Sequence, residues 1–189
     1  LIDEEKEKGP DGRIFIKINS LTDAHIINSL SEASCAGVQI TMVVRGICCL
    51  LPGIVGKTEN IRIISIVGRY LEHSRIYCFG SGSSEKMYIS SADFMTRNTE
   101  RRVEVACPIY DIHVRERIHR IIDAILSDTL KARVLMSDGV YVKKPIVDEP
   151  IDSQEFLMEQ AEKNAASAAE TSHRFSLLGF LRRLFGRRG

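Results

Sequence analysis

The chain has 189 residues, of which 44% are hydrophobic and 27% are charged, and its formal net charge is +1. This length and apolar content are sufficient to bury a sizeable core, so we expect one compact domain plus an appendage. The balanced charge provides no general basic field and argues against nucleic acid as a partner. No apolar run reaches the roughly 18 residues of a membrane-spanning helix.

Five cysteines without Cys-x-x-Cys spacing give no zinc signature and no disulfide framework. They favour a reducing, cytoplasmic setting. The chain begins at Leu1, without an initiator methionine and without the pattern of a signal peptide. We therefore expect it to be a fragment of a longer protein.

Hydrophobic periodicity predicts many short strands. Ile14, Ile16 and Ile18 alternate with Phe15 and Lys17, which is the period of a strand with one strongly buried face. A nearly continuous apolar run, as at 38–44, instead suits an internal strand covered on both faces. The predicted strands are 13–19, 38–44, 60–67, 76–79, 86–90, 101–109, 131–136 and 140–142.

Two stretches have the period of an amphipathic helix. The first can be capped by Ser20 or Thr22 and ends at Gly37; its apolar side carries Ile26, Ile27, Leu30 and Ala33. The second covers 111–126; Ile118, Ile121, Ile122 and Ile125 should face the core, with Arg115, Glu116 and Arg117 solvated. His113 and His119 lack the spacing of metal ligands, so we interpret them as helix-surface residues.

One histidine, His73, lies among cations and small hydroxyls. Arg69 and Arg75 flank it, and Arg45 follows a predicted strand, where open α/β sheets bind ligands. Imidazole titrates near neutrality, and guanidinium offers a fork of donors to phosphate oxygens. These residues predict a phosphate site. The alternatives are an ordinary surface or core histidine and a surface arginine at a strand end.

The composition changes near residue 148. Residues 154–170 are rich in alanine and glutamate, which is typical of a solvated helix or a partly disordered linker. In 175–189, leucines and phenylalanines are set among arginines. This last segment is compatible with peripheral contact to an anionic membrane or polyanion, with docking on a partner, or with an unstructured tail.

Several motifs in order resemble the C-terminal half of bacterial polyphosphate kinase. The family moves the terminal phosphate of ATP onto inorganic polyphosphate and depends on histidine. The motifs are Gly9-Pro10-Asp11-Gly12-Arg13, Lys17-Ile18-Asn19-Ser20-Leu21, Val43-Val44-Arg45-Gly46-Ile47-Cys48, Leu51-Pro52-Gly53, Glu59-Asn60-Ile61-Arg62, Ser65-Ile66-Val67, Arg69-Tyr70-Leu71-Glu72-His73, Ser90-Ser91-Ala92-Asp93, Arg97-Asn98 and Arg102-Val103-Glu104. Phe94 departs from the family motif, which has tryptophan at that position.

The resemblance implies an α/β fold, a phospholipase D-like half-domain whose mixed β-sheet is flanked by helices on both faces. It divides the chain into 1–20, the end of a preceding catalytic half-domain; 21–147, the C-terminal catalytic half-domain; and 148–189, a charged helical or disordered tail. It implies reversible transfer of the ATP terminal phosphate to polyphosphate through a phosphohistidine upstream of this sequence. ATP, ADP and polyphosphate are then the ligands, and a homo-oligomer is expected.

The resemblance also assigns site residues. Arg45 and His73 match positions that contact ATP phosphates, and His73 would donate a proton or hydrogen bond during transfer. Additional phosphate-site candidates are Arg69, Arg75, Arg97, Lys17, Asn19, Ser91 and Asp93. No metal ligand is expected in this chain, because the Mg²⁺ site and the adenine contact belong to the preceding half-domain.

The same residues also allow other interpretations. Arg69 and Arg97 could instead form surface ion pairs with Glu72 and Glu100. The chain could be a noncatalytic module that binds ATP or polyphosphate, and we predict no polymer synthesis by these 189 residues alone. A phospholipase D-like phosphodiesterase is a third reading, disfavoured because Arg75 stands where that family has lysine.

Overall fold

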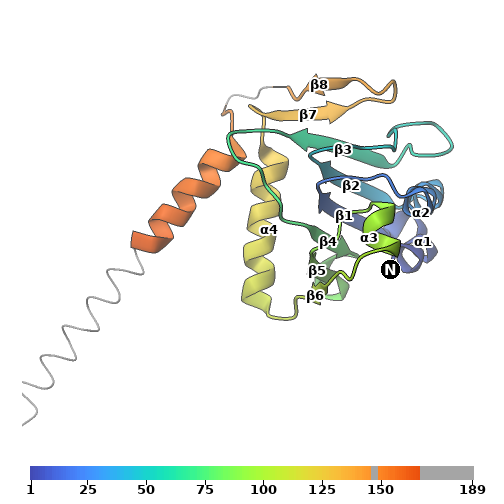
Figure 1. The fold of residues 1–189 in the computed structure, drawn as a ribbon, viewed down its shortest axis with the longest axis horizontal. Coiled ribbons are helices and arrows are strands. Elements are labelled where there is room, and N and C mark those ends of the chain that lie inside the picture. Colours follow the sequence, from blue (N-terminus) through green and yellow to red (C-terminus); the bar gives the residue numbers. More distant parts are fainter. Residues whose placement is uncertain (146–148, 167–189) are drawn as a thin grey trace, which may run out of the picture.

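The computed structural model describes residues 1–145 and 149–166. Eight strands form one mixed sheet in the order β6-β5-β4-β1-β2-β3-β7-β8 (Figure 1). The strands are β1 (Arg13–Ile18), β2 (Gln39–Val44), β3 (Ile61–Ile66), β4 (Ile76–Phe79), β5 (Lys86–Ser90), β6 (Ala106–Pro108), β7 (Ala132–Leu135) and β8 (Tyr141–Lys143). The central strands β1, β2 and β3 are parallel, and the strands outside them pair antiparallel.

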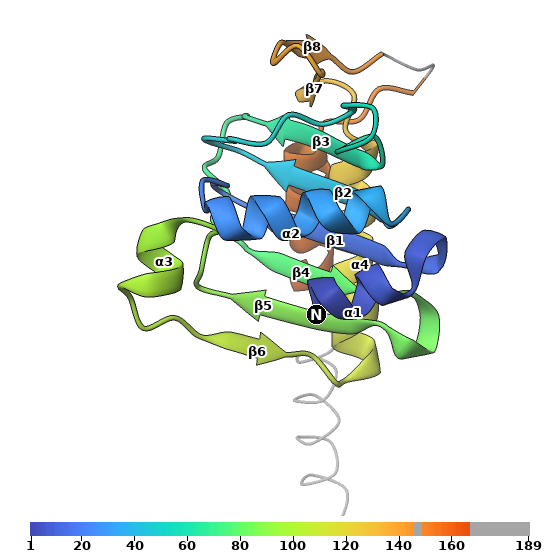
Figure 2. The same cartoon turned by 90° about the vertical axis from the view of Figure 1, so that its right-hand side faces the viewer.

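Helices cover both faces of this sheet, which confirms the predicted fold class. They are α1 (Ile2–Glu7), α2 (Ala24–Cys35), α3 (Thr96–Glu100) and α4 (Ile112–Ser127), with short 3₁₀ turns at Gly9–Asp11 and Gly82–Ser84. Residues 153–166 form a further helix. Figure 2 shows α1 and α2 in front of the sheet, and α4 with helix 153–166 behind it.

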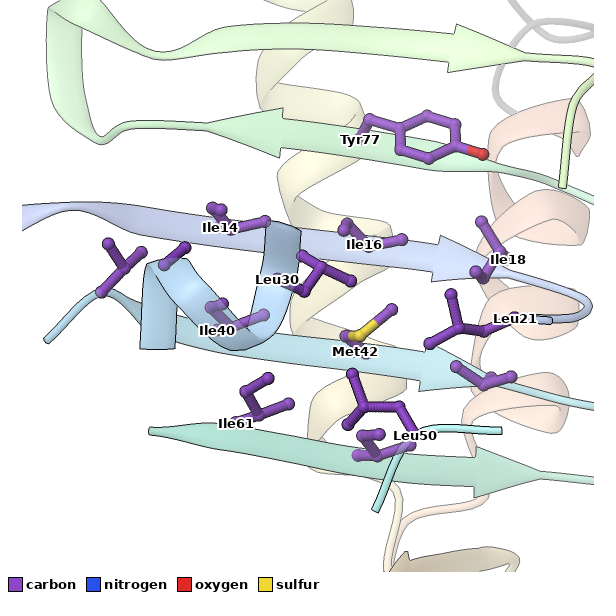
Figure 3. Close-up of a cluster of buried hydrophobic side chains, with 14 of the residues drawn as sticks. Ile14, Ile16, Ile18, Leu21, Leu30, Ile40, Met42, Leu50, Ile61 and Tyr77 are labelled. Carbon is purple, nitrogen blue, oxygen red and sulfur yellow. The ribbon is translucent and has the colours of Figure 1, made fainter. Parts of the chain in front are cut away.

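The alternation of β1 determines which helix each residue meets. Ile14, Ile16 and Ile18 belong to the larger core, where Leu30 of α2 and Met42 of β2 pack against them (Figure 3). Phe15, on the opposite face, packs with residues of α4. The six-residue strand β1 is thus covered by α2 on one face and α4 on the other. This packing fixes the position of the residues that follow β1.

Local details correct several sequence expectations. The cap of α2 is Asp23, whose carboxylate accepts from the N–H groups of His25 and Ile26, and neither Ser20 nor Thr22 takes this role. The strand predicted at 101–109 shortens to the three residues of β6, and the helix α3 before it was not predicted. These differences reflect local polar contacts that hydrophobic period does not report.

The helix predicted at 111–126 is confirmed as α4, but its polar face is not uniformly solvated. Arg115 is largely buried and forms an ion pair of 2.9 Å with Glu85. His119 contacts the same carboxylate at 2.9 Å. Arg115 is therefore less solvated than expected, whereas Glu116 and Arg117 are exposed as predicted and His119 remains partly exposed.

The expected division at residue 20 does not separate two units of packing. β1 lies at the centre of the sheet, between β2 and β4, and supplies core residues to both faces. The appendage is also better attached than expected, since Ser153 and Gln154 are buried at the start of helix 153–166. The segment 175–189, for which membrane or partner contact was considered, lies outside the described residues.

Candidate phosphate-binding site

The carboxyl ends of β1 and β2 bring Asn19 and Arg45 together. The two strands are parallel and in register, and the turn after β2 continues the contact through Gly46 N–H, which donates to Asn19 O at 2.7 Å. A Cβ atom at position 46 would lie 2.9 Å from that oxygen, so glycine permits the close approach. The Arg45 side chain, which follows the buried strand β2, is thereby held at the edge where open α/β sheets bind ligands.

Asp93 organises this edge. One carboxylate oxygen accepts from the backbone N–H of Asn19 at 2.7 Å, and both oxygens accept from Arg75, at 3.1 and 3.0 Å. Burial alone would raise the pKa of Asp93, but the Arg75 and Asn19 donors outweigh burial and lower it. Asp93 is therefore an ionised carboxylate at neutral pH that fixes two neighbouring side chains.

Arg45 is oriented through Asn19. The Asn19 amide nitrogen faces Asp93 at 3.2 Å, which turns its oxygen toward Arg45, where it accepts from Nε at 3.2 Å and Nη2 at 3.0 Å. Within residues 1–145 and 149–166, no carboxylate lies within 4.0 Å of the Arg45 guanidinium. Its positive charge is thus held in place by a neutral acceptor and left uncompensated.

Lys17 is a second, nearly buried cation at the same edge. Nζ donates to Ser74 Oγ at 2.8 Å and Ser74 O at 3.1 Å, and it lies 3.4 Å from a carboxylate oxygen of Glu72. Burial lowers the pKa of Lys17, and the nearby charges of Arg45 and Arg75 lower it further against the opposing effect of Glu72. The cations of this site therefore share one electrostatic environment.

His73 lies in an exposed loop whose backbone is held by Lys17 and Arg75. Its neighbour Ser74 is held by Lys17, and its own carbonyl accepts from Arg75 Nη1 at 3.0 Å. The imidazole is exposed, so it can meet a ligand in solution or another surface of protein. The loop backbone is anchored at this point while the ring remains available.

The segment carrying Asp93 is fixed by aromatic and backbone contacts. Tyr77 donates from its hydroxyl to Ala92 O at 2.6 Å, and its ring lies 5.1 Å from the ring of Phe94. The carbonyl of Phe94 accepts from the N–H groups of Thr22 and Asp23. Phenylalanine at this position therefore retains an aromatic packing role beneath the site.

Three of the predicted site residues lie outside this network. Arg69 is exposed, packs over the ring of Tyr70 and approaches Glu155 at 3.9 Å, whereas its expected surface partner Glu72 pairs with Lys17. Arg97 is exposed on α3 and, among the residues described, has no ion pair with Glu100. Ser91 bonds instead to Glu104 and to the N–H of Val105.

Two residues that sequence reasoning missed complete the site. Glu72 pairs with Lys17, and Gln154 contacts both Glu72 and the backbone of Tyr70. Glu72 stands inside the histidine motif and could have been suspected from its neighbours. Gln154 is more than 80 residues away from Tyr70 and Glu72 in sequence. The alanine- and glutamate-rich segment that it begins contains no motif that would indicate this contact.

The structure offers no cluster for a resident metal in the parts of the chain it describes. No group of three or more His, Cys, Asp and Glu side chains there could hold an ion. Asp93 and Glu72 are already engaged by Arg75 and Lys17.

Within the residues that the structure describes, no helix is both long and apolar enough to cross a bilayer.

This arrangement lies within a stretch that matches a known family. The model of "Polyphosphate kinase C-terminal domain 2" matches residues 1–165. The chain belongs to this family. A polyphosphate kinase of Bacillus cereus is 51% identical over 170 residues, covering 87% of this chain, and one of Synechocystis is 45% identical over 164 residues. The chain spans only 24% and 22% of the lengths of these two curated relatives.

Solved structures agree with the family assignment. A polyphosphate kinase from Porphyromonas gingivalis is similar with a TM-score of 0.81 and 39% identity, covering 88% of this chain and 26% of that one. A phospholipase D family member from Salmonella typhimurium has a TM-score of 0.50 at 15% identity, covering 71% of this chain and 91% of that one. The second likeness concerns the fold alone, and it agrees with the predicted phospholipase D-like half-domain.

Proposed function

We propose that this chain forms the C-terminal part of a polyphosphate kinase site, which transfers the terminal phosphate of ATP reversibly to inorganic polyphosphate. Membership of the polyphosphate kinase C-terminal domain family supports this assignment. The observation that carries it is Arg45: a guanidinium fixed by a neutral amide, without a carboxylate partner within the described ranges. A fixed, uncompensated cation is suited to binding the phosphates of nucleotide or polymer.

Arg45 and His73 take different roles in this proposal. Arg45 holds phosphate oxygens, on which negative charge spreads in the transition state of phosphoryl transfer. His73, exposed on its loop, donates a hydrogen bond or proton to the moving group. Lys17, Asn19, Arg75 and Asp93 orient these two residues through the contacts described above.

The remaining chemistry is assigned to protein outside this chain. The phosphohistidine is expected in a preceding half-domain, and a phosphoprotein intermediate divides the reaction into two transfers. Mg²⁺ would neutralise phosphate charge when it is bound with the nucleotide. The carboxylates near Arg45 are committed to cations, so the Mg²⁺ ligands are proposed to lie outside this chain as well.

The test uses the complete gene product that contains this chain, supplied with ATP and Mg²⁺, and measures polymer formation. Arg45→Ala and His73→Ala should each reduce the rate by on the order of 10²-fold or more, because each removes a group that stabilises the transition state. Arg62→Ala is the matched control, since Arg62 is exposed on β3 and points away from the core. Ordinary turnover by the His73 variant would contradict its assigned role.

Binding can be tested on the 189-residue chain itself. Inorganic tripolyphosphate, titrated by calorimetry, should bind the unmodified chain and lose affinity with Arg45→Ala but not with Arg62→Ala. The chain alone should form no polymer. Polymer synthesis by these 189 residues would show that the phosphohistidine does not have to come from elsewhere.

A further inference from the structure

We propose that Gln154 is a positioning residue that holds the His73 loop, residues 67–75, in its working geometry. The inference rests on the proposed function, because it concerns the same histidine. It gives a role to the start of helix 153–166, a segment whose sequence suggested only an appendage.

The His73 loop has little structure of its own. Val67, Tyr70 and Leu71 are 62%, 42% and 66% exposed, so the loop buries little apolar surface. Outside the regular strands, no backbone-to-backbone hydrogen bond among the described residues involves 67–74. A segment of this kind depends on side chains from other elements for its position.

Gln154 supplies such a contact, because its side-chain amide pairs with the Tyr70 backbone as a neighbouring strand would. Its Oε1 accepts from Tyr70 N at 2.9 Å, and its Nε2 donates to Tyr70 O at 2.9 Å. The same Nε2 donates to Glu72 Oε1 at 3.0 Å. The amide therefore satisfies both backbone groups of one loop residue and, through Glu72, reaches the ion pair of Lys17.

The start of helix 153–166 is itself rigidly held, which allows Gln154 to position the loop. Ser153 is fully buried, and its N–H and hydroxyl donate to one oxygen of Asp128 at 2.8 and 2.7 Å. The other oxygen of Asp128 accepts from the N–H groups of Lys131 and Ala132. One buried carboxylate thus links the helix to the turn between α4 and β7.

Gly68 leaves room for this contact. A Cβ atom at position 68 would collide with Gln154 Oε1 and would also lie 2.9 Å from Gln154 Cδ. The amide therefore lies directly against the loop backbone at Gly68 and bonds to it at Tyr70. A methyl group at 68 should push the amide away from Tyr70.

The first experiment measures hydrogen exchange of the Tyr70 amide in the 189-residue chain and needs no activity. Gln154→Ala should accelerate this exchange about fivefold, because the acceptor is lost. Gln154→Met fills a similar space without the amide and should accelerate it equally, which separates hydrogen bonding from packing. Gln160→Ala, the same change farther along helix 153–166, should leave it unchanged.

The second experiment measures kinetics in the complete gene product. Gln154→Met should lower kcat about tenfold while KM for ATP changes less than about twofold, since a misplaced His73 affects the transition state while Arg45 keeps its own anchors. A merely structural role would be restored by methionine. Wild-type kcat in the Met variant, together with accelerated Tyr70 exchange, would overturn the proposal.

A double-mutant cycle joins the two sides of the contact. Gly68→Ala alone should accelerate Tyr70 exchange, but it should have little additional effect in the Gln154→Ala background, where the colliding side chain is gone. Additive effects would contradict a direct contact. If His73→Ala leaves synthesis intact, the proposed function fails, whereas unchanged Tyr70 exchange in Gln154→Ala defeats this proposal alone.

Discussion

Two buried carboxylates lie at opposite ends of the central strands. Both are paired with arginine, but they differ in the charge that their surroundings leave unpaired. Near the beginning of β1, Glu85 neutralises Arg115 and also contacts His119. Beyond the end of β1, Asp93 neutralises Arg75 and turns Asn19 toward a second arginine, Arg45, which has no acidic partner in the described structure.

The difference lies in the third member of each cluster. At the Glu85 end the additional group is a histidine that contacts the carboxylate itself, so the cluster is locally closed. At the Asp93 end a neutral amide stands between the carboxylate and the additional cation. Buried ion pairs are weak evidence for a binding site. An oriented cation without a counterion is better evidence, because an external anion can complete it.

Removing the two carboxylates tests this distinction and should give the largest effects. Asp93→Ala leaves the partly buried Arg75 without its carboxylate partner and should lower the free energy of unfolding by about 3 kcal/mol. Glu85→Ala should also destabilise, since Arg115 is similarly covered. Chemical denaturation measures both losses.

Only the Asp93 change should affect anion binding. Calorimetric titration with tripolyphosphate, under conditions where each variant is folded, should show weaker binding for Asp93→Ala and unchanged binding for Glu85→Ala. Asp93→Asn, which retains the shape and one acceptor, serves if the alanine variant does not fold. Equal losses of affinity at both ends would remove the distinction between the clusters.

Asn19→Ala tests the amide that separates them. Arg45 should keep its charge but lose its only oriented acceptor in the described residues, so affinity for tripolyphosphate should fall about five- to tenfold. Asn60→Ala is a matched control, because that amide bonds to Ser34 O before β3 begins, at the other end of the parallel central strands from Asn19. Unchanged affinity in Asn19→Ala would show that Arg45 is positioned by other means.

The sequence was sufficient for the framework of this site and insufficient for its partners. The alternation of Ile14, Ile16 and Ile18 predicts β1, and a charged residue after an apolar strand predicts that Arg45 lies at a binding edge. Hydrophobic periodicity and the order of motifs do not indicate which cation pairs with which carboxylate. Arg75 and Arg69 both flank His73 in sequence, but Arg75 bonds to Asp93 whereas Arg69 approaches Glu155.

Long-range polar contacts were least accessible to sequence reasoning. Gln154 reaches Tyr70 because Asp128 fixes the neighbouring Ser153. Arg115 was placed on a solvated face because its helix is amphipathic, whereas Glu85 draws it inward. In both cases the decisive partner lies at least 30 residues away.

Acid should weaken the Asp93 cluster and the Asp128 link together. Burial opposes ionisation of each carboxylate, but hydrogen bonds outweigh it and hold both pKa values below the ordinary value of 3.8. The unfolded chain therefore binds more protons, and stability from these groups is complete above that value and lost as pH falls through the folded pKa. Each unit of difference corresponds to about 1.4 kcal/mol.

Urea unfolding between pH 7 and pH 2.5 measures this dependence. The free energy of unfolding should change little from these groups down to about pH 5 and then decline. Asp93→Asn and Asp128→Asn should be less stable at pH 7 and show a shallower decline, whereas Gln160→Ala should follow the unmodified chain. A slope unaffected by either Asp variant would contradict the lowered pKa values.

The smallest effect is expected from His119, the member that closes the Glu85 cluster. Its side chain is 45% exposed and makes one contact with Glu85, which retains Arg115 as a partner. His119→Gln should therefore change the free energy of unfolding by no more than about 1 kcal/mol, as for a partly exposed polar contact. Tripolyphosphate affinity should be unchanged, because the cluster lies at the other end of β1 from Arg45. A loss of affinity in this variant would connect the two ends and break the comparison between them.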